Sequence, residues 1–394
     1  MTVSVEQRRT ALGFIVCLGI VSLFADMTYE GAHSSIGPYL KNLGASAAEV
    51  SIIAGLGEML GASLRFFSGR LASRTHAYWT ITMFGYAMNV IAVPALAFAG
   101  NWQMAAALVI AERTGKALRG PARDVLLSEA TEQVGHGFGF GLHSIMDQTG
   151  AVIGPVVMFF AVARSGEHFG PAFLWLVVPA LGTMIALTVA RVLHPSQGAS
   201  ARNPSTQALP KVFWYYVAAA GLLAFGYADF PLLAVHFQNR EFFKPQFIPL
   251  LYAGAMGVNG LAAFIFGRLF DRIGLIVLVI GTLISLLALP LGFLGNQTAA
   301  IASVGCWAAG LGAQDASLRS GIAQVVSMNK RGNAFGAFNG VFGVMWFLGS
   351  AAIGLLYDAH ALYALVALGV AAQLSAAAMF MFIRGPLAQA AAQR

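Results

Sequence analysis

Several acids and histidines occur inside stretches of the chain that are otherwise apolar. They form three groups, each with a carboxylate and an imidazole: Asp26, Glu30 and His33; His143 and Asp147; and Asp229 and His236. The spacings within the groups are three, four or seven residues, which place side chains on one face of an α-helix. Because a charged group at mid-membrane is costly, each one needs a partner or a water-lined cavity.

Three interpretations of these groups stay open. Carboxylates and imidazoles beside water can take up and release protons near neutral pH. The same side chains suit divalent nickel, cobalt, iron or zinc, and the potential ligands are Asp26, Glu30, His33, Asp229 and His236. However, the sequence has no His-rich loop and no Cys or Met cluster. Structural ion pairs are the third interpretation.

The composition indicates that lipid surrounds much of the chain. Hydrophobic residues make up 58% of 394 positions and charged residues only 10%, against roughly 45–50% and 25% in soluble domains. A water-soluble protein could not cover its surface with so few charges. The two cysteines, Cys17 and Cys306, fall in apolar runs, so we expect small buried side chains and no disulfide.

The apolar segments predict an all-α integral membrane protein of about twelve spans in two pseudo-symmetric six-helix bundles. We expect residues 1–193 and 211–394 to form the bundles and the polar residues 194–210 to form a cytoplasmic linker. The predicted helices cover 11–35, 47–68, 77–98, 102–120, 136–162, 171–193, 211–238, 246–267, 275–294, 298–326, 334–356 and 360–383.

The net charge is +7. The cationic side chains fall mainly in alternate loops and not in one patch, so they do not favour a nucleic-acid partner. Seventeen Arg and Lys side chains fall on one side of the predicted topology and four on the other, namely Lys41, Arg164, Arg240 and Lys244. This bias predicts that both termini are cytoplasmic. The first apolar run lacks a small-residue cleavage pattern, so we expect it to be retained as a span.

The chain also repeats itself at about half its length. Residues 68–74 recur as 266–272, and Asp26 and His33 recur as Asp229 and His236. Internal duplication of six-span units is typical of secondary transporters, whose sites lie between the halves.

On these residues the whole chain resembles the major facilitator superfamily. The family's motif after the second span is Gly-x-x-x-Asp-Arg-x-Gly. The second half matches it at Gly267, Asp271, Arg272 and Gly274, and the first half keeps Gly69, Arg70 and Arg74 but has Ser73 and His76 at the Asp and Gly positions. The resemblance implies a gating role for these residues. Ser73 carries no charge, so the first half lacks the charge contact that the motif Asp would provide.

Two further motifs support the resemblance. Gly141, Gly150, Gly154 and Pro155 have the spacing of the family's antiporter motif, which implies export in exchange for protons. The residues after Glu112 loosely resemble the family's fourth-span arginine motif, as found in a prokaryotic subgroup with nickel-resistance-type exporters. Along that segment, Arg113 is expected to face the cavity, and Arg119 and Arg123 to belong to a gate network.

The resemblance and the buried acids together predict a proton-coupled exporter of a small organic molecule in the bacterial inner membrane. Asp26 and Glu30 are the leading candidates for proton carriers, and Arg113 would help a neighbouring acid to release its proton. Divalent metal efflux on the same fold is the alternative. No nucleophile elbow, zinc-protease motif or phosphate loop occurs in the sequence, so we expect neither an enzyme nor a receptor. We expect a monomer without catalytic residues, bound metal or cofactor.

Overall fold

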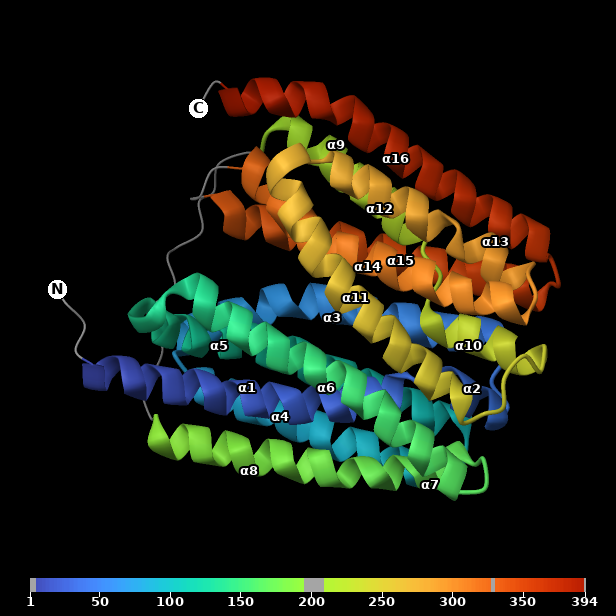
Figure 1. Cartoon of the computed structure of the whole chain (residues 1–394), viewed down its shortest axis with the longest axis horizontal. Coiled ribbons are helices and arrows are strands. Elements are labelled where there is room, and N and C mark those ends of the chain that lie inside the picture. Colours follow the sequence, from blue (N-terminus) through green and yellow to red (C-terminus); the bar gives the residue numbers. More distant parts are fainter. Residues whose placement is uncertain (1–4, 195–208, 327–329, 393–394) are drawn as a thin grey trace. The chain divides into compact units, whose positions relative to one another are not determined.

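A computed structural model describes residues 5–194, 209–326 and 330–392, and helices make up the regular structure of these ranges (Figure 1). They group into two compact units. Unit 1 comprises Met1–Gly44, Leu64–Arg202 and Pro245–Ala253, and unit 2 comprises Ala45–Ser63, Asn203–Lys244 and Gly254–Arg394. The predicted halves 1–193 and 211–394 stay a prediction, and the compact units differ from them in residues 45–63 and 245–253.

Unit 1 is built around α1. Its helices are α1 (Val5–His33), α2 (Ile36–Asn42), the later part of α3 (Ala47–Thr75), α4 (Tyr78–Ala95), α5 (Trp102–Val134), α6 (His136–Arg164), α7 (Phe169–Ala172) and α8 (Val177–Leu193). The short 3₁₀ turns Leu96–Phe98 and Phe173–Leu176 join neighbouring helices. A buried apolar core, which includes Leu18, Tyr86 and Leu187, holds α1, α4, α5 and α8 together.

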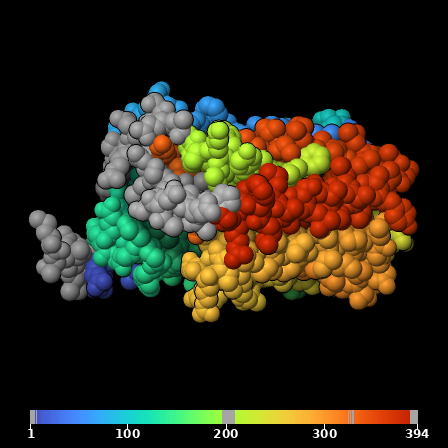
Figure 2. Space-filling view, turned by 90° about the horizontal axis from the view of Figure 1, so that it is seen from above, coloured from blue at the N-terminus to red at the C-terminus, as the bar shows by residue number. Residues whose placement is uncertain are grey.

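Unit 2 contains the helices of the second half. They are α9 (Lys211–Phe225), α10 (Phe230–Asn239), most of α11 (Phe247–Ile273), α12 (Ile276–Leu286), α13 (Ala288–Phe293), α14 (Gln297–Val325), α15 (Arg331–Asp358) and α16 (Leu362–Ala392). In the space-filling view α16, in red, lies along the gold helices α12 and α13 (Figure 2). The first part of α3 also belongs to unit 2, where the Asp358 carboxylate accepts from the backbone amides of Ala47 and Ala48 at 3.1 and 3.0 Å.

The protein is an all-α integral membrane protein with about twelve transmembrane helices. Ten helical segments of the described chain are long and apolar enough to cross a bilayer. α5 and α14, the fourth and tenth predicted spans, are not among these ten although they contain 33 and 29 residues. α5 carries Glu112, Arg113 and Lys116 in its interior. The two helices with low apolar content therefore occupy matching places in the two halves.

Several predicted spans end or break at other residues than expected, and the fourth and the seventh differ most clearly. The fourth was predicted to end at residue 120, but α5 continues through Pro121 to Val134. Pro121 cannot donate a backbone hydrogen bond, and the Ser68 hydroxyl donates to the nearby Leu118 carbonyl at 2.5 Å. The seventh was predicted as one helix over 211–238, but it is broken between Phe225 and Phe230. Most of the predicted linker lies outside the described residues.

The repeated motif lies at the ends of two helices and not in loops. α3 ends at Thr75 and α11 at Ile273, and the next residues, His76 and Gly274, have φ angles of 54° and 58°. A positive φ after a helix is normally provided by glycine. The two motif copies also share a contact, because an arginine stacks on the phenylalanine four residues earlier: Arg70 on Phe66 at 5.5 Å and Arg268 on Phe264 at 3.6 Å.

Replacing His76 by glycine is expected to stabilise the protein by about 0.5–1 kcal/mol, because glycine adopts the left-handed conformation without a steric penalty. Thermal unfolding of the purified protein in detergent measures the effect. The matched control is Gly274→Ala, which places a side chain at the corresponding position of the second half and should destabilise by a similar amount. Equal unfolding temperatures for His76→Gly and wild type would contradict this account.

Candidate functional site

The polar face of α1 is the centre of the site. Ser22, Asp26, Glu30 and His33 follow one another at spacings of four, four and three, and α1 is an unbroken helix through all of them. Asp26 is buried, with 7% of its surface exposed. The helices that cover this face are α5 and α6 of the same unit.

α6 packs closely on α1 because two motif glycines face the α1 backbone. A Cβ atom at Gly150 would clash with the carbonyl oxygen of Leu23, and one at Gly154 with the carbonyl oxygen of Met27. Pro155 follows directly within α6. Gly141 is different, since a Cβ there would meet nothing within 4 Å. Gly150 and Gly154 thus provide close packing of α6 on α1, and Gly141 does not.

Close packing of α1 and α6 brings two carboxyl groups together. Asp26 on α1 and Asp147 on α6 lie within hydrogen-bonding range of each other through their side chains. Carboxylate oxygens can only accept, so one of the two groups must carry a proton when this bond is made. Lys116 on α5 lies within electrostatic range of both. The approach of the two helices therefore allows the pair to share a proton.

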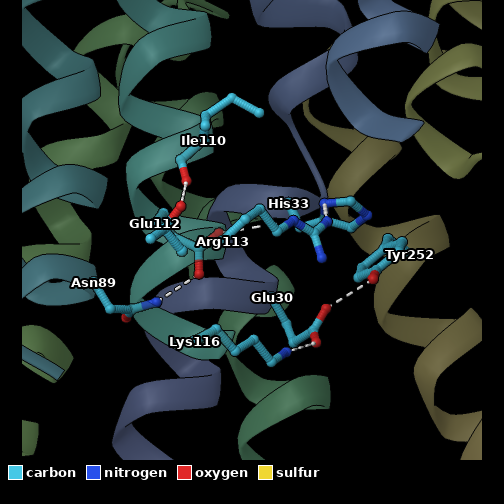
Figure 3. A network of polar contacts seen from close by, with 9 residues as sticks. Glu30, His33, Asn89, Ile110, Glu112, Arg113, Lys116 and Tyr252 are labelled. Carbon is cyan, nitrogen blue, oxygen red and sulfur yellow. Dashed lines mark hydrogen bonds and ion pairs between the residues drawn. The ribbon is translucent and has the colours of Figure 1, made fainter. Parts of the chain in front are cut away.

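Glu30, one turn further along α1, has two partners from different parts of the chain (Figure 3). Its Oε1 lies 3.5 Å from Lys116 Nζ, and its Oε2 accepts from the Tyr252 hydroxyl at 2.7 Å. Lys116 Nζ also lies 3.3 Å from the centre of the Tyr29 ring. Tyr252 belongs to the start of α11, the segment that the second half of the sequence contributes to unit 1.

Arg113 contacts His33 and Glu112 in the same network (Figure 3). Its Nη2 donates to His33 Nδ1 at 2.9 Å, and its guanidinium carbon lies 4.9 Å from the Tyr29 ring centre. Its Nε lies 3.8 Å from Glu112 Oε2, and Glu112 Oε1 accepts from Asn89 at 2.6 Å. His33 Nδ1 therefore acts as an acceptor and is not available to a metal ion in this arrangement.

His143, Arg123 and Ser22 meet at the opposite end of the α1 face. Ser22 Oγ lies 2.9 Å from His143 Nε2 and accepts from Arg123 Nη1 at 3.1 Å. Arg123 also binds the Asp124 carboxylate at 2.9 Å. His143 and Asp147 lie within electrostatic range of each other, as their spacing predicted. All candidate site residues of the first half, apart from the motif at the end of α3, thus lie along α1, α5 and α6.

The second-half candidates lie in unit 2 and bond the same helix. Asp229 begins α10 at the break of the seventh span and accepts from Trp346 Nε1 at 2.7 Å and Ser350 Oγ at 2.5 Å. His236 Nδ1 lies 3.1 Å from the Tyr357 hydroxyl. Trp346, Ser350 and Tyr357 are all on α15. Asp229 and His236 therefore bond different turns of α15 and do not form one carboxylate–imidazole pair.

The remaining motif residues have few contacts. Arg74, Asp271 and Arg272 are exposed and form no ion pair within the described part of the chain. A Cβ at Gly69 would lie 3.4 Å from Pro121, and one at Gly267 would lie 3.8 Å from Ala316.

The structure offers no support for the proposed metal ligands. In the ranges that it describes, no three His, Cys, Asp or Glu side chains lie close enough to hold a metal ion.

Replacing Tyr252 by phenylalanine is expected to lower the free energy of unfolding by about 1–2 kcal/mol. The variant keeps the ring contact with His33 but leaves Glu30 without one hydrogen-bond donor, and bonds to charged groups contribute about 1.5–3 kcal/mol when buried. Chemical or thermal unfolding in detergent measures the change. The control is Tyr215→Phe, at an exposed position of α9, which should leave stability unchanged. A smaller effect for Tyr252→Phe than for the control would refute the assigned contact.

Comparison with known proteins decides the family. The model of the Major Facilitator Superfamily matches residues 17–350. The chain belongs to the Major Facilitator Superfamily. An uncharacterized protein of Mycobacterium tuberculosis (strain H37Rv) is 37% identical over 387 residues, which cover 96% of this chain and 94% of that protein.

Solved structures of the same fold agree with this membership. A mutant of the nucleoside transporter NupG matches with a TM-score of 0.77 at 13% identity, covering 94% of this chain and 100% of that one. A bacterial homologue of the iron transporter ferroportin matches with a TM-score of 0.67 at 15% identity, covering 94% and 98%. At such identities these likenesses show the fold alone. This major facilitator protein is thus a multi-pass membrane transporter of a small molecule.

Proposed function

We propose that this major facilitator protein exports a small organic compound in exchange for protons, by alternating access. The observation that carries the proposal is the close approach of the Asp26 and Asp147 carboxyl groups on two neighbouring membrane-spanning helices, which allows them to share one proton. Such a pair can gain a second proton or lose the one it holds. Two like charges at close range oppose the fully ionised state, so a nearby cation is needed to stabilise it.

Lys116 is placed to provide that cation. It lies within electrostatic range of Asp26 and Asp147 and pairs with Glu30 at 3.5 Å. Its side chain is 26% exposed, more than the other cation of the network, Arg113. Loss of the shared proton favours movement of the ammonium towards the aspartates, and uptake of a proton favours its return to Glu30. A positively charged substrate could replace Lys116 at the same carboxylates, which would couple substrate binding to proton release.

Glu30 links the proton carriers to the rest of the transporter. Its partner Tyr252 lies on α11, whose first turns belong to unit 1 and whose remainder belongs to unit 2. A change of charge at Glu30 therefore acts directly on a helix that both units share. This connection supports a role for Glu30 in coupling protonation to the conformational change.

The same proposal includes the cell membrane and the orientation. The excess of cations on one side of the topology supports a plasma-membrane transporter with both termini in the cytoplasm. The proposed working form is a monomer.

Growth and vesicle experiments test the proposal. A sensitive bacterial strain that expresses the protein is screened for resistance to ethidium, tetraphenylphosphonium, nickel chloride and cobalt chloride. A protective compound is then added to inside-out vesicles with an acidic interior, and a pH-sensitive dye reports proton release. Proton exchange predicts that the compound discharges the gradient only in vesicles with the protein. Resistance to nickel or cobalt alone would mean that the substrate is a metal ion and not an organic compound. Transport unaffected by an uncoupler would exclude proton coupling.

A further inference from the structure

The interface between α4 and α5 contains buried polar atoms that have no hydrogen-bond partner in the described part of the chain. They are Thr82 Oγ1, Tyr86 Oη, Asn89 Oδ1 and Arg119 Nε. The four side chains are 0, 0, 0 and 2% exposed. Thr82, Tyr86 and Asn89 follow at spacings of four and three, so they share one face of α4. Buried polar groups are rarely left without a partner, so these four atoms are candidate contacts for a bound molecule or ion.

Arg119, on α5, packs against the ring of Tyr86. Its guanidinium carbon lies 4.0 Å from the centre of the Tyr86 ring. The two helices cross closely here, because a Cβ at Gly85 would lie 2.6 Å from the Gly115 carbonyl oxygen and 2.7 Å from Arg119 Cβ. Arg119 is therefore fixed against the α4 face and is removed from bulk water.

The acids of this region already bond other groups. Glu112 accepts from Asn89 and lies near Arg113, and Asp124 binds Arg123. Arg119 forms no ion pair among the residues that the structure describes, although Glu112 acts on it at longer range. Arg119 and Arg123 both lie within electrostatic range of His143, and the Tyr86 hydroxyl lies within range of Arg123. Two arginines, Arg119 and Arg123, therefore act on Tyr86.

We propose that Arg119, Tyr86 and Thr82 form a binding site for a small monovalent anion of halide size. The guanidinium and the two hydroxyls supply donors from both helices, and the anion offsets a buried charge that lacks a direct partner. Asn89 Oδ1 is an acceptor and cannot donate to an anion. The site is therefore limited to the part of the cluster around Thr82 and Tyr86. The bound anion joins α4 to α5.

Thermal unfolding of the full-length protein in detergent tests the site. Sodium bromide replaces sodium gluconate at constant ionic strength. The expected result is a saturable rise of the unfolding temperature of about 3 °C. Thr82→Val and Tyr86→Phe each remove one hydroxyl, and each should raise the bromide concentration for half of this rise about tenfold. Tyr86→Phe keeps the ring under Arg119, so it isolates the hydroxyl from the cation–π contact.

The matched control is Thr183→Val on α8 of the same unit. Thr183 is equally buried, but its hydroxyl already donates to the Pro179 carbonyl at 2.9 Å, so its bromide response should equal that of the wild type. Anomalous diffraction from crystals grown in bromide should place the ion beside Arg119. A response that does not saturate, a wild-type response in both variants, or diffraction that shows only water beside Arg119 would overturn the proposal. None of these readouts depends on transport, so the site can fail while the proposed function stands.

Discussion

Asp26→Asn is expected to reduce proton-driven transport at least about 100-fold, the lower range for loss of a positioned acid–base group. Asparagine cannot bind or release a proton, but its amide can donate to the Asp147 carboxylate, so the contact between α1 and α6 survives. The variant should therefore fold and insert normally. Flux in vesicles with an imposed pH gradient measures the loss. Exchange of labelled for unlabelled substrate without a gradient should continue, because it needs no net proton movement.

Two further variants sharpen this result. Glu30→Gln should also abolish gradient-driven flux, since Lys116 loses its charged partner while Tyr252 keeps an acceptor. Glu132→Gln, at an exposed acid on α5, serves as the matched control and should transport at the wild-type rate. If Asp26→Asn and Glu30→Gln both transport at wild-type rates under the same gradient, these acids are not the proton carriers.

The apolar runs predicted the helices well because span length and lipid composition leave few alternatives. Helical periodicity also placed Asp26, Glu30 and His33 on one face of α1. It could not say what that face meets. Tyr252 lies more than two hundred residues away from Glu30, and nothing about a tyrosine in an apolar run distinguishes this one from an interface anchor. Asn89 was missed for the same reason, as its partner is on another helix.

Other errors had local signals that were available. Asp229 is followed by Phe230 and Pro231, an acid and a proline placed as they are at the start of a helix, and the helix break occurs there. The fourth span was predicted to end just before Pro121, because a proline often ends a helix. There α5 continues because Pro121 packs beside Gly69 and Ser68 bonds a neighbouring carbonyl. Tertiary contacts of this kind are not visible in one sequence.

The motif glycines on α6 give the second large effect. Gly154→Ala is expected to destabilise the protein by about 3 kcal/mol, at the upper end for overpacking, because the new Cβ clashes with the Met27 carbonyl oxygen and the clash cannot be relieved by a side-chain rotation. The displacement separates α1 from α6, so the hydrogen bond between Asp26 and Asp147 is lost with the packing. Unfolding temperature and gradient-driven flux should fall together.

Gly141→Ala is the decisive comparison, because both residues belong to one spaced motif and only their surroundings differ. A Cβ at Gly141 enters open space, and alanine favours a helix over glycine by about 1 kcal/mol, so this variant should be as stable as the wild type or slightly more so. Equal losses in both variants would mean that the motif acts as a unit, through flexibility of α6. Loss in Gly154→Ala alone means that the motif acts through contact, by holding two carboxyl groups close enough to share a proton.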